Sequence, residues 1–103
     1  MFIHLDVTSE EQWQSAIAET VSRFGKLDVL VNNAAIWRRG IVEQTTGDHW
    51  DAIMDVNAKG VFLGTKLVIP EMRNAGGGSI INISSVAGLV GSLTSSAYST
   101  SKG

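Results

Sequence analysis

The sequence predicts an α/β fold with a parallel sheet. Three short apolar runs have the composition of strands, and they lie at Phe2–Leu5, Leu27–Val31 and Ser79–Ile83. Segments with the apolar spacing of helices separate these runs. Strand, helix and strand joined by short connections form a βαβ unit, in which the strands are parallel and the crossover is right-handed.

Length and composition narrow the class of protein. With 103 residues, the chain is at most one small domain, and its net charge of −2 gives no reason to expect nucleic acid or an anionic membrane as a partner. The absence of cysteine excludes disulfides and thiolate chemistry, and it leaves the cellular compartment open. No apolar run approaches the ~20 residues of a membrane span.

The first helix is predicted from its cap, its charges and its spacing. Thr8 or Ser9 can cap it, and two glutamates follow in the first turn, where the helix dipole favours negative charge. Apolar residues recur at helical intervals, at Trp13, Ala16, Ile17, Val21 and Phe24. Gly25 is expected to end the helix.

The middle of the chain predicts a loop followed by two helical stretches. After the loop Ile36–Gly40, Thr45 or Thr46 can cap a helix that runs to Val56. Helical pattern continues from Ala58 to Met72. Asn57 lies between the two stretches, and asparagine is a mediocre helix former, so we expect a kink or a junction there.

The last twenty residues carry the groups with the clearest chemistry. Ser84 and Ser85 follow the third strand, and Ser95 or Ser96 can cap a helix that contains Tyr98 and Lys102. These two residues are four apart and therefore share a helix face.

Serine, tyrosine and lysine in this order along the chain can together transfer a proton to or from a substrate. A free tyrosine is a poor base at neutrality, but a lysine ammonium held beside it favours the phenolate. A serine hydroxyl at the strand end can hydrogen-bond the substrate oxygen that gains or loses the proton. The spacing alone is weak evidence, because any amphipathic helix can produce Tyr-x-x-x-Lys by chance.

Several motifs together resemble the classical short-chain dehydrogenase/reductase family. Gly78–Ser85 followed by Tyr98–Lys102 is similar to the active-site segment of that family. Three further motifs stand in the right order: Asp6-Val7-Thr8, Asn32-Asn33-Ala34-Ala35, and Asn57 in Val56-Asn57-Ala58-Lys59-Gly60. The resemblance extends over the whole chain, although Ala35 replaces the glycine that usually follows the first alanine of its motif.

The resemblance implies a Rossmann-like, doubly wound parallel sheet of which this chain holds the third to fifth strands with their helices. Residues 1–103 are then the central fragment of a single NAD(P)-binding oxidoreductase domain. The first strand with its glycine-rich pyrophosphate turn would lie before Met1, because no G-x-G-x-x-G pattern occurs in the chain. The isolated fragment is therefore expected to be inactive.

The activity implied by the resemblance is the NAD(P)-dependent interconversion of an alcohol and a ketone. Tyr98 is then the general acid/base, and Lys102 activates it and contacts the nicotinamide ribose. Ser85 orients the substrate oxygen, whereas Ser84 is structural. Asn57 maintains a proton relay, in which its backbone carbonyl holds a water molecule joined to the lysine.

The resemblance also implies contacts to NAD or NADP. The Asp6 side chain and the Val7 backbone would lie at the adenine, the Asn33–Ala34 backbone at a ribose, and Tyr98 and Lys102 at the nicotinamide end. Each position has a simpler interpretation as well, since Asp6 can start a turn and Asn33 can belong to a polar strand exit. Neither histidine has partners at metal-ligand spacing, so no metal role is expected.

Partners and alternatives complete the prediction. We expect a small-molecule alcohol or ketone as substrate, neither nucleic acid nor membrane as partner, a homo-oligomeric parent protein (dimer or tetramer) and a cytoplasmic location. The first alternative is a catalytically silent truncated fragment. The second is an epimerase or dehydratase on a related fold, which Asn57 with Ser85 disfavours.

Overall fold

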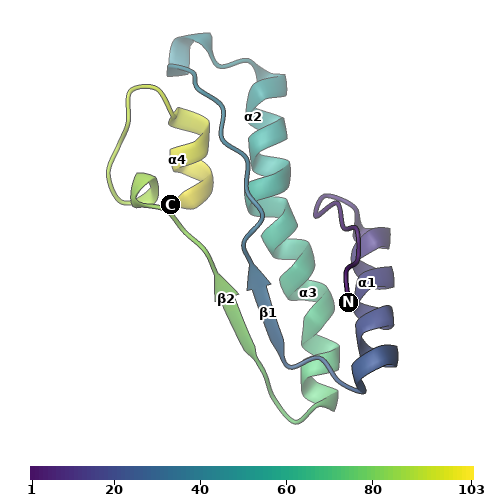
Figure 1. Ribbon diagram of the computed structural model, residues 1–103. Coiled ribbons are helices and arrows are strands. Elements are labelled where there is room, and N and C mark those ends of the chain that lie inside the picture. Colours follow the sequence, from purple (N-terminus) through teal and green to yellow (C-terminus); the bar gives the residue numbers. More distant parts are fainter.

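A computed structural model describes residues 1–103 (Figure 1). Its helices and strands follow the order α1 (Glu10–Phe24), β1 (Val29–Asn32), α2 (Gly47–Met54), α3 (Gly60–Asn74), β2 (Ser79–Asn82) and α4 (Ser96–Lys102). This is a mixed α/β structure with a two-stranded parallel sheet, consistent with part of a Rossmann-like fold. No helix combines the length and the apolar character that crossing a membrane requires.

Helix α1 confirms the predicted capping signals. The Ser9 hydroxyl accepts a hydrogen bond from the backbone N–H of Gln12 at 3.3 Å. At the other end Gly25 adopts a left-handed φ of 82°, a conformation that glycine takes without steric cost, and its N–H donates to the carbonyl of Val21. Trp13, Ala16 and Ile17 are the buried residues of the helix.

Strands β1 and β2 are adjacent and parallel, as the fold class predicts. Their register runs from Val29 opposite Ser79 to Asn32 opposite Asn82. The N–H of Ile83 extends the pairing by donating to the carbonyl of Asn32 at 3.1 Å.

The predicted strand at Phe2–Leu5 is wrong: this segment forms no regular secondary structure. Its apolar side chains do suit a sheet, but a strand also needs a neighbour that takes up its backbone hydrogen bonds. A hollow that Phe2, Ile3 and Leu5 help to line separates the segment from β1. Leu5 still packs against the core, whereas Phe2 is exposed.

Helices α2 and α3 join into one long rod (Figure 1). Thr46 caps α2 as predicted, because its hydroxyl accepts from the N–H of His49 at 3.1 Å. Residues Asp55–Lys59 form a single π-helical turn between the helices. The predicted kink or junction at Asn57 is thereby confirmed, and wide turns of this kind are frequent at functional sites.

The core is small and lies where α1 crosses α3. Trp13, Ile17 and Leu63 form its buried cluster, and Leu30 of β1 packs against them. Gly64 permits this approach, because a Cβ atom there would lie 2.8 Å from the Trp13 ring. The radius of gyration is 15.5 Å, against about 13 Å for a compact chain of this length, because α2 and α4 extend away from the core.

Candidate active site

The end of strand β2 positions two serines differently. The Ser84 hydroxyl donates to the backbone carbonyl of Lys102 at 2.8 Å and so ties α4 to the strand. The Ser85 hydroxyl accepts from the N–H of Ala87 at 3.2 Å and begins the short 3₁₀ turn Val86–Gly88. Ser84 therefore has a structural bond between elements, while Ser85 keeps its hydroxyl proton free to donate to a ligand.

Helix α4 begins at the predicted place, but the predicted serine cap does not form. Ser95 occupies the N-cap position without a side-chain bond to the helix. Its hydroxyl instead accepts from the indole N–H of Trp37 at 2.9 Å. The N–H of Gly40 donates to the carbonyl of Thr94 at 2.9 Å, so the loop after β1 fixes the start of α4.

Tyr98 and Lys102 occupy one face of α4, and both are half-buried. Ala97 and Ser101 turn another face toward the interior, where Ala97 is 2% exposed. The Lys102 ammonium reaches the end of β2, donating to the carbonyl of Ile83 at 2.8 Å. No hydrogen bond joins the Tyr98 hydroxyl to Ser85 or Lys102 within the chain.

Asn57 connects three segments through its side chain. Its Oδ1 accepts from the N–H of Ile36 at 2.8 Å, and its Nδ2 donates to the carbonyl of Ile36 at 2.9 Å. The second hydrogen of Nδ2 is donated to the Ser101 hydroxyl of α4 at 3.0 Å. Both amide hydrogens are thus used, and Asn57 fixes the loop after β1 and the helix of Tyr98 to the π-helical turn.

A hollow of about 280 Å³ opens where these elements meet. Asn57, Ser84, Ser101 and Lys102 are among its lining residues. Two of the four predicted catalytic residues, Asn57 and Lys102, therefore share one cavity. Ser85 and Tyr98 lie near it in the chain but outside its lining.

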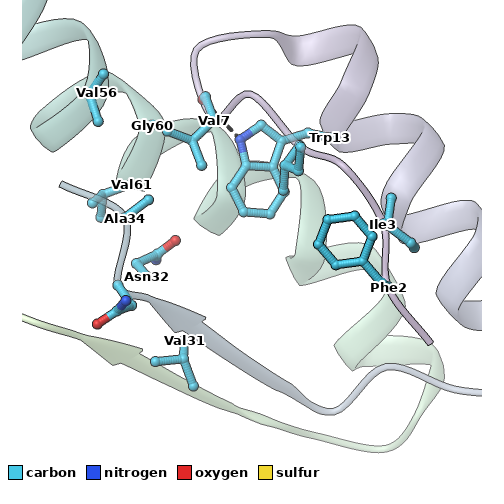
Figure 2. Close-up of a pocket in the computed structure, with 12 residues that line it drawn as sticks. Phe2, Ile3, Val7, Trp13, Val31, Asn32, Ala34, Val56, Gly60 and Val61 are labelled. Atoms are coloured by element: carbon cyan, nitrogen blue, oxygen red, sulfur yellow. Dashed lines mark hydrogen bonds between the residues drawn. The ribbon is translucent and has the colours of Figure 1, made fainter. Parts of the chain in front are cut away.

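A second hollow, of about 590 Å³, lies between the N-terminal segment and the end of β1 (Figure 2). Val7, Asn33 and Ala34 line it, whereas Asp6 does not. The Asn32 amide at the strand end donates to the Asn82 side chain at 2.9 Å, which joins the two strands beyond their backbone ladder. Three of the predicted cofactor residues thus share this hollow, whereas Lys102 lines the smaller one and Tyr98 lines neither.

Asp6 is an exposed carboxylate held in a local turn. Its Oδ1 accepts from the backbone N–H of Thr8 at 2.9 Å and from the Thr8 hydroxyl at 2.8 Å. The backbone hydrogen bond, followed by the hydroxyl bond, lowers the pKa of Asp6 because both bonds favour the charged form. The simpler interpretation of Asp6, as the start of a turn, describes the conformation it adopts.

The larger hollow suits one part of a dinucleotide better than another. Nine of its twelve lining residues are hydrophobic, which fits the apolar faces of an adenine. No lysine or arginine lines it, so it offers no cation to a pyrophosphate. No group of three or more His, Cys, Asp or Glu side chains could hold a metal ion.

Sequence reasoning missed three residues that organise this region: Trp37, Ser95 in its bond to Trp37, and Ser101. Trp37 could have been noticed as a large aromatic residue inside a loop. Ser101 gave no signal, because serine is common on helix surfaces and its partner Asn57 lies 44 residues away.

Comparison with known proteins places the chain beside alcohol-oxidising enzymes. The family pattern described as short chain dehydrogenase matches residues 1–103. Trans-4-hydroxycyclohexanecarboxylate dehydrogenase of Sinomonas cyclohexanicum is 52% identical over 102 residues, which cover 99% of this chain and 39% of that protein. Cyclopentanol dehydrogenase of Comamonas sp. is 46% identical, with 99% and 41% covered.

A further relative is the 3-alpha-(or 20-beta)-hydroxysteroid dehydrogenase of Mycobacterium bovis, 48% identical over 98% of this chain and 39% of that protein. The chain thus spans about two fifths of the length of the curated relatives that it matches.

Proposed function

Because the chain belongs to the short-chain dehydrogenase family, we propose that it is the central part of a longer NAD(P)-dependent oxidoreductase that interconverts an alcohol and a ketone. The relatives described above are dehydrogenases of cyclopentanol, of a hydroxycyclohexane carboxylate and of hydroxysteroids. All three names denote ring compounds, and we take a ring-borne secondary alcohol as the substrate class.

The observation that carries this proposal is the docking of α4. The bond from Ser84 to the carbonyl of Lys102 and the bond from Asn57 to Ser101 fix this helix against the end of β2 and the π-helical turn. The carboxyl ends of parallel strands are where α/β sheets bind their ligands. The helix that carries Tyr98 and Lys102 is held at that edge.

In the proposed reaction Tyr98 takes the proton of the alcohol during oxidation and returns it during reduction. Lys102 stabilises the phenolate by its positive charge. One of its ammonium hydrogens is donated to Ile83, which leaves two for the tyrosine oxygen and a ribose hydroxyl. Ser85 donates its free hydroxyl proton to the substrate oxygen.

The backbone of Asn57 has the role in this proposal that the resemblance implies, and its side chain has a separate one. Its amide hydrogens are already donated to Ile36 and Ser101, so the side chain cannot also relay protons. We assign the relay contribution to its backbone carbonyl, which the π-helical turn positions. The side chain then acts by holding α4 in place.

NAD or NADP supplies the hydride acceptor and donor when it is bound. The backbone and side chains of Val7, Asn33 and Ala34 would hold its adenosine part in the larger hollow. Lys102 and Tyr98 would hold its nicotinamide end. The cation or helix terminus for its pyrophosphate would come from outside these 103 residues, so we propose that the isolated chain has no dehydrogenase activity.

We also propose that the parent protein is a homo-oligomer. The rod of α2 and α3 keeps large apolar side chains in solvent, with Trp50 38% and Phe62 59% exposed. Burying them against a second copy would give the rod the second apolar contact that its sequence favours. A cytoplasmic location is part of the same proposal.

The first test is the DNA on both sides of this frame. A continuous upstream segment encoding a strand followed by G-x-x-x-G-x-G is the expected result. Stop codons or unrelated sequence there would favour the catalytically silent fragment instead.

The second test uses the full-length protein with Tyr98→Phe, which removes one hydroxyl. We expect kcat for alcohol oxidation to fall at least about 100-fold, since general acid–base catalysis contributes ~10²–10⁴-fold. Cofactor binding, measured by fluorescence titration, should stay nearly unchanged. Lys102→Ala should impair both quantities, while Lys66→Ala, at an exposed lysine paired with Glu10, serves as the control. A fully active Tyr98→Phe enzyme contradicts the assignment.

A further inference from the structure

Trp37 is a large, mostly apolar residue whose side chain is exposed but anchored by a hydrogen bond. It lies on the loop that leaves β1 and runs beside α4 (Figure 1), and its side chain is 55% exposed. The indole N–H, its only polar group, donates to the Ser95 hydroxyl at 2.9 Å, and Ser95 itself is 7% exposed. The part of the indole that remains in solvent is therefore entirely apolar.

Helix α4 begins without a side-chain capping bond. A serine at the N-cap normally accepts from the first turn of its helix, which contributes about 1 kcal/mol to stability. Ser95 stands at the N-cap but makes no such bond, and its hydroxyl accepts from Trp37 instead. The fold thus gives up a cap and keeps an exposed ring in a fixed position.

The fixed position is on the side of the proposed catalytic residues. Ser95, Tyr98 and Lys102 are spaced by three and four residues, so they form one stripe along the helix. The bridge between Gly40 and Ser95 holds the loop in register with the start of the helix. A ring attached to the Ser95 side chain therefore lies at the end of the stripe that carries Tyr98.

The chain segment that leads from β2 into α4 is apolar as well. The segment from β2 to α4 exposes Val86, Leu89, Val90 and Leu93, each with 63% or more of its surface in solvent. Exposed apolar side chains thus precede the helix on one chain segment, and Trp37 flanks it on another. Such surroundings favour a ligand with an apolar carbon skeleton.

We propose that Trp37 is a substrate-contacting residue whose indole face packs against the ring of an alicyclic secondary alcohol and presents its hydroxyl group to Tyr98. This inference rests on the proposed function and deepens it. A flat ring held by one hydrogen bond covers the face of a saturated ring more completely than it covers a short open chain. Trp37 therefore discriminates between the two kinds of alcohol.

The test is steady-state kinetics of the full-length enzyme with cyclohexanol and 2-pentanol. Trp37→Ala should lower kcat/KM for cyclohexanol about tenfold, mainly by raising KM, and should lower it no more than about twofold for 2-pentanol. Trp37→Phe keeps a ring without the anchoring N–H and should fall between. Ser95→Ala removes the anchor and should resemble Trp37→Phe. Phe24→Ala, at an exposed aromatic residue at the end of α1, should leave the ratio of the two substrates unchanged.

The outcomes separate the inference from its premise. If neither alcohol is oxidised by the unmodified, folded and cofactor-loaded enzyme, the proposed function fails and this inference fails with it. If the unmodified enzyme is active and Trp37→Ala lowers kcat/KM equally for both alcohols, the function stands and Trp37 has only a structural role. If Trp37→Ala does not fold, an unchanged substrate ratio in both Trp37→Phe and Ser95→Ala overturns the inference.

Discussion

The two faces of the β1–β2 sheet are made of similar residues but have different surroundings. On one face Leu30 packs against the Trp13, Ile17 and Leu63 cluster between α1 and α3. On the other face Val31 and Ile81 stand opposite each other, 50% and 45% exposed. Figure 1 shows α1 and α3 on one side of the strands.

The difference shows that strand sequence alone does not decide burial. Both strands are apolar on both faces, a pattern typical of parallel sheets that helices cover on each side. Here one cover is present, so Val31 and Ile81 on the other face stay about half exposed. The two faces should therefore respond to substitution in opposite ways.

The largest effect is expected on the covered face. Leu63→Ala truncates a side chain of α3 that covers this face and is 3% exposed, and such truncations cost about 2–5 kcal/mol. A small core leaves little reserve, so the isolated chain should lose most of its helical circular dichroism at 20 °C. Val31→Ala, on the bare face, is the matched control and should keep the signal. Equal losses in the two variants would show that the faces do not differ.

A smaller effect is expected from the bare face, and on association rather than on folding. Exposed β-branched side chains beside unpaired strand edges promote self-association. Val31→Lys with Ile81→Lys should leave the helical signal unchanged and lower the fraction of aggregated chain. Sedimentation velocity measures this fraction, with Glu19→Lys as a charge-matched control on α1. Unchanged aggregation would mean that another surface is responsible.

The smallest effect is expected from charged groups that belong to neither face. Lys26 and Asp28 pair at 2.6 Å on the surface just before β1. The hydrogen bond and the charge of Lys26 lower the pKa of Asp28, and those of Asp28 raise the pKa of Lys26. The pKa of Asp6 is lowered as well, in this case by its hydrogen bonds from the Thr8 backbone and hydroxyl.

The sign of the acid effect follows from these shifts. A carboxyl whose folded pKa is depressed stabilises the folded state above its unfolded pKa, and this contribution is lost as the pH falls through the folded value. As the pH falls below the ordinary pKa of aspartate, about 4, stability should therefore decline slightly, and Asp28→Asn should remove part of that decline. Both groups are exposed, so urea titrations should detect a shift far smaller than that of Leu63→Ala. If Asp28→Asn changes the stability in acid more than Leu63→Ala changes the stability at neutral pH, the proposed ranking is reversed.

Local signals predicted the helices well. Ser9, Gly25 and Thr46 act where their sequence positions suggested, because capping depends on neighbours within a few residues. The junction at Asn57 was predicted for the same reason, although the wide π-helical form of the turn was not. The strand predicted at Phe2–Leu5 does not form, because a strand needs a pairing partner and such a partner is usually distant in sequence.

In the candidate site too, some features could be predicted from the sequence and others could not. Motif order brought Tyr98, Lys102, Ser85 and Asn57 to attention, and their catalytic roles stay predictions. The bonds that fix the region, Trp37 to Ser95 and Asn57 to Ser101, join residues 58 and 44 positions apart. No spacing rule relates such pairs, so they could not be read from the chain.

The sequence by itself determined where helices begin and end, which strands are parallel, and to which family the chain belongs, because these depend on local periodicity, on capping and on motif order. Only the tertiary structure decided which strand finds a partner, which face of the sheet is covered, and that the Ser95 hydroxyl binds an indole instead of capping its own helix. The physical reason is that each of these outcomes is a competition between groups distant in sequence. Distance and packing settle it, and composition does not.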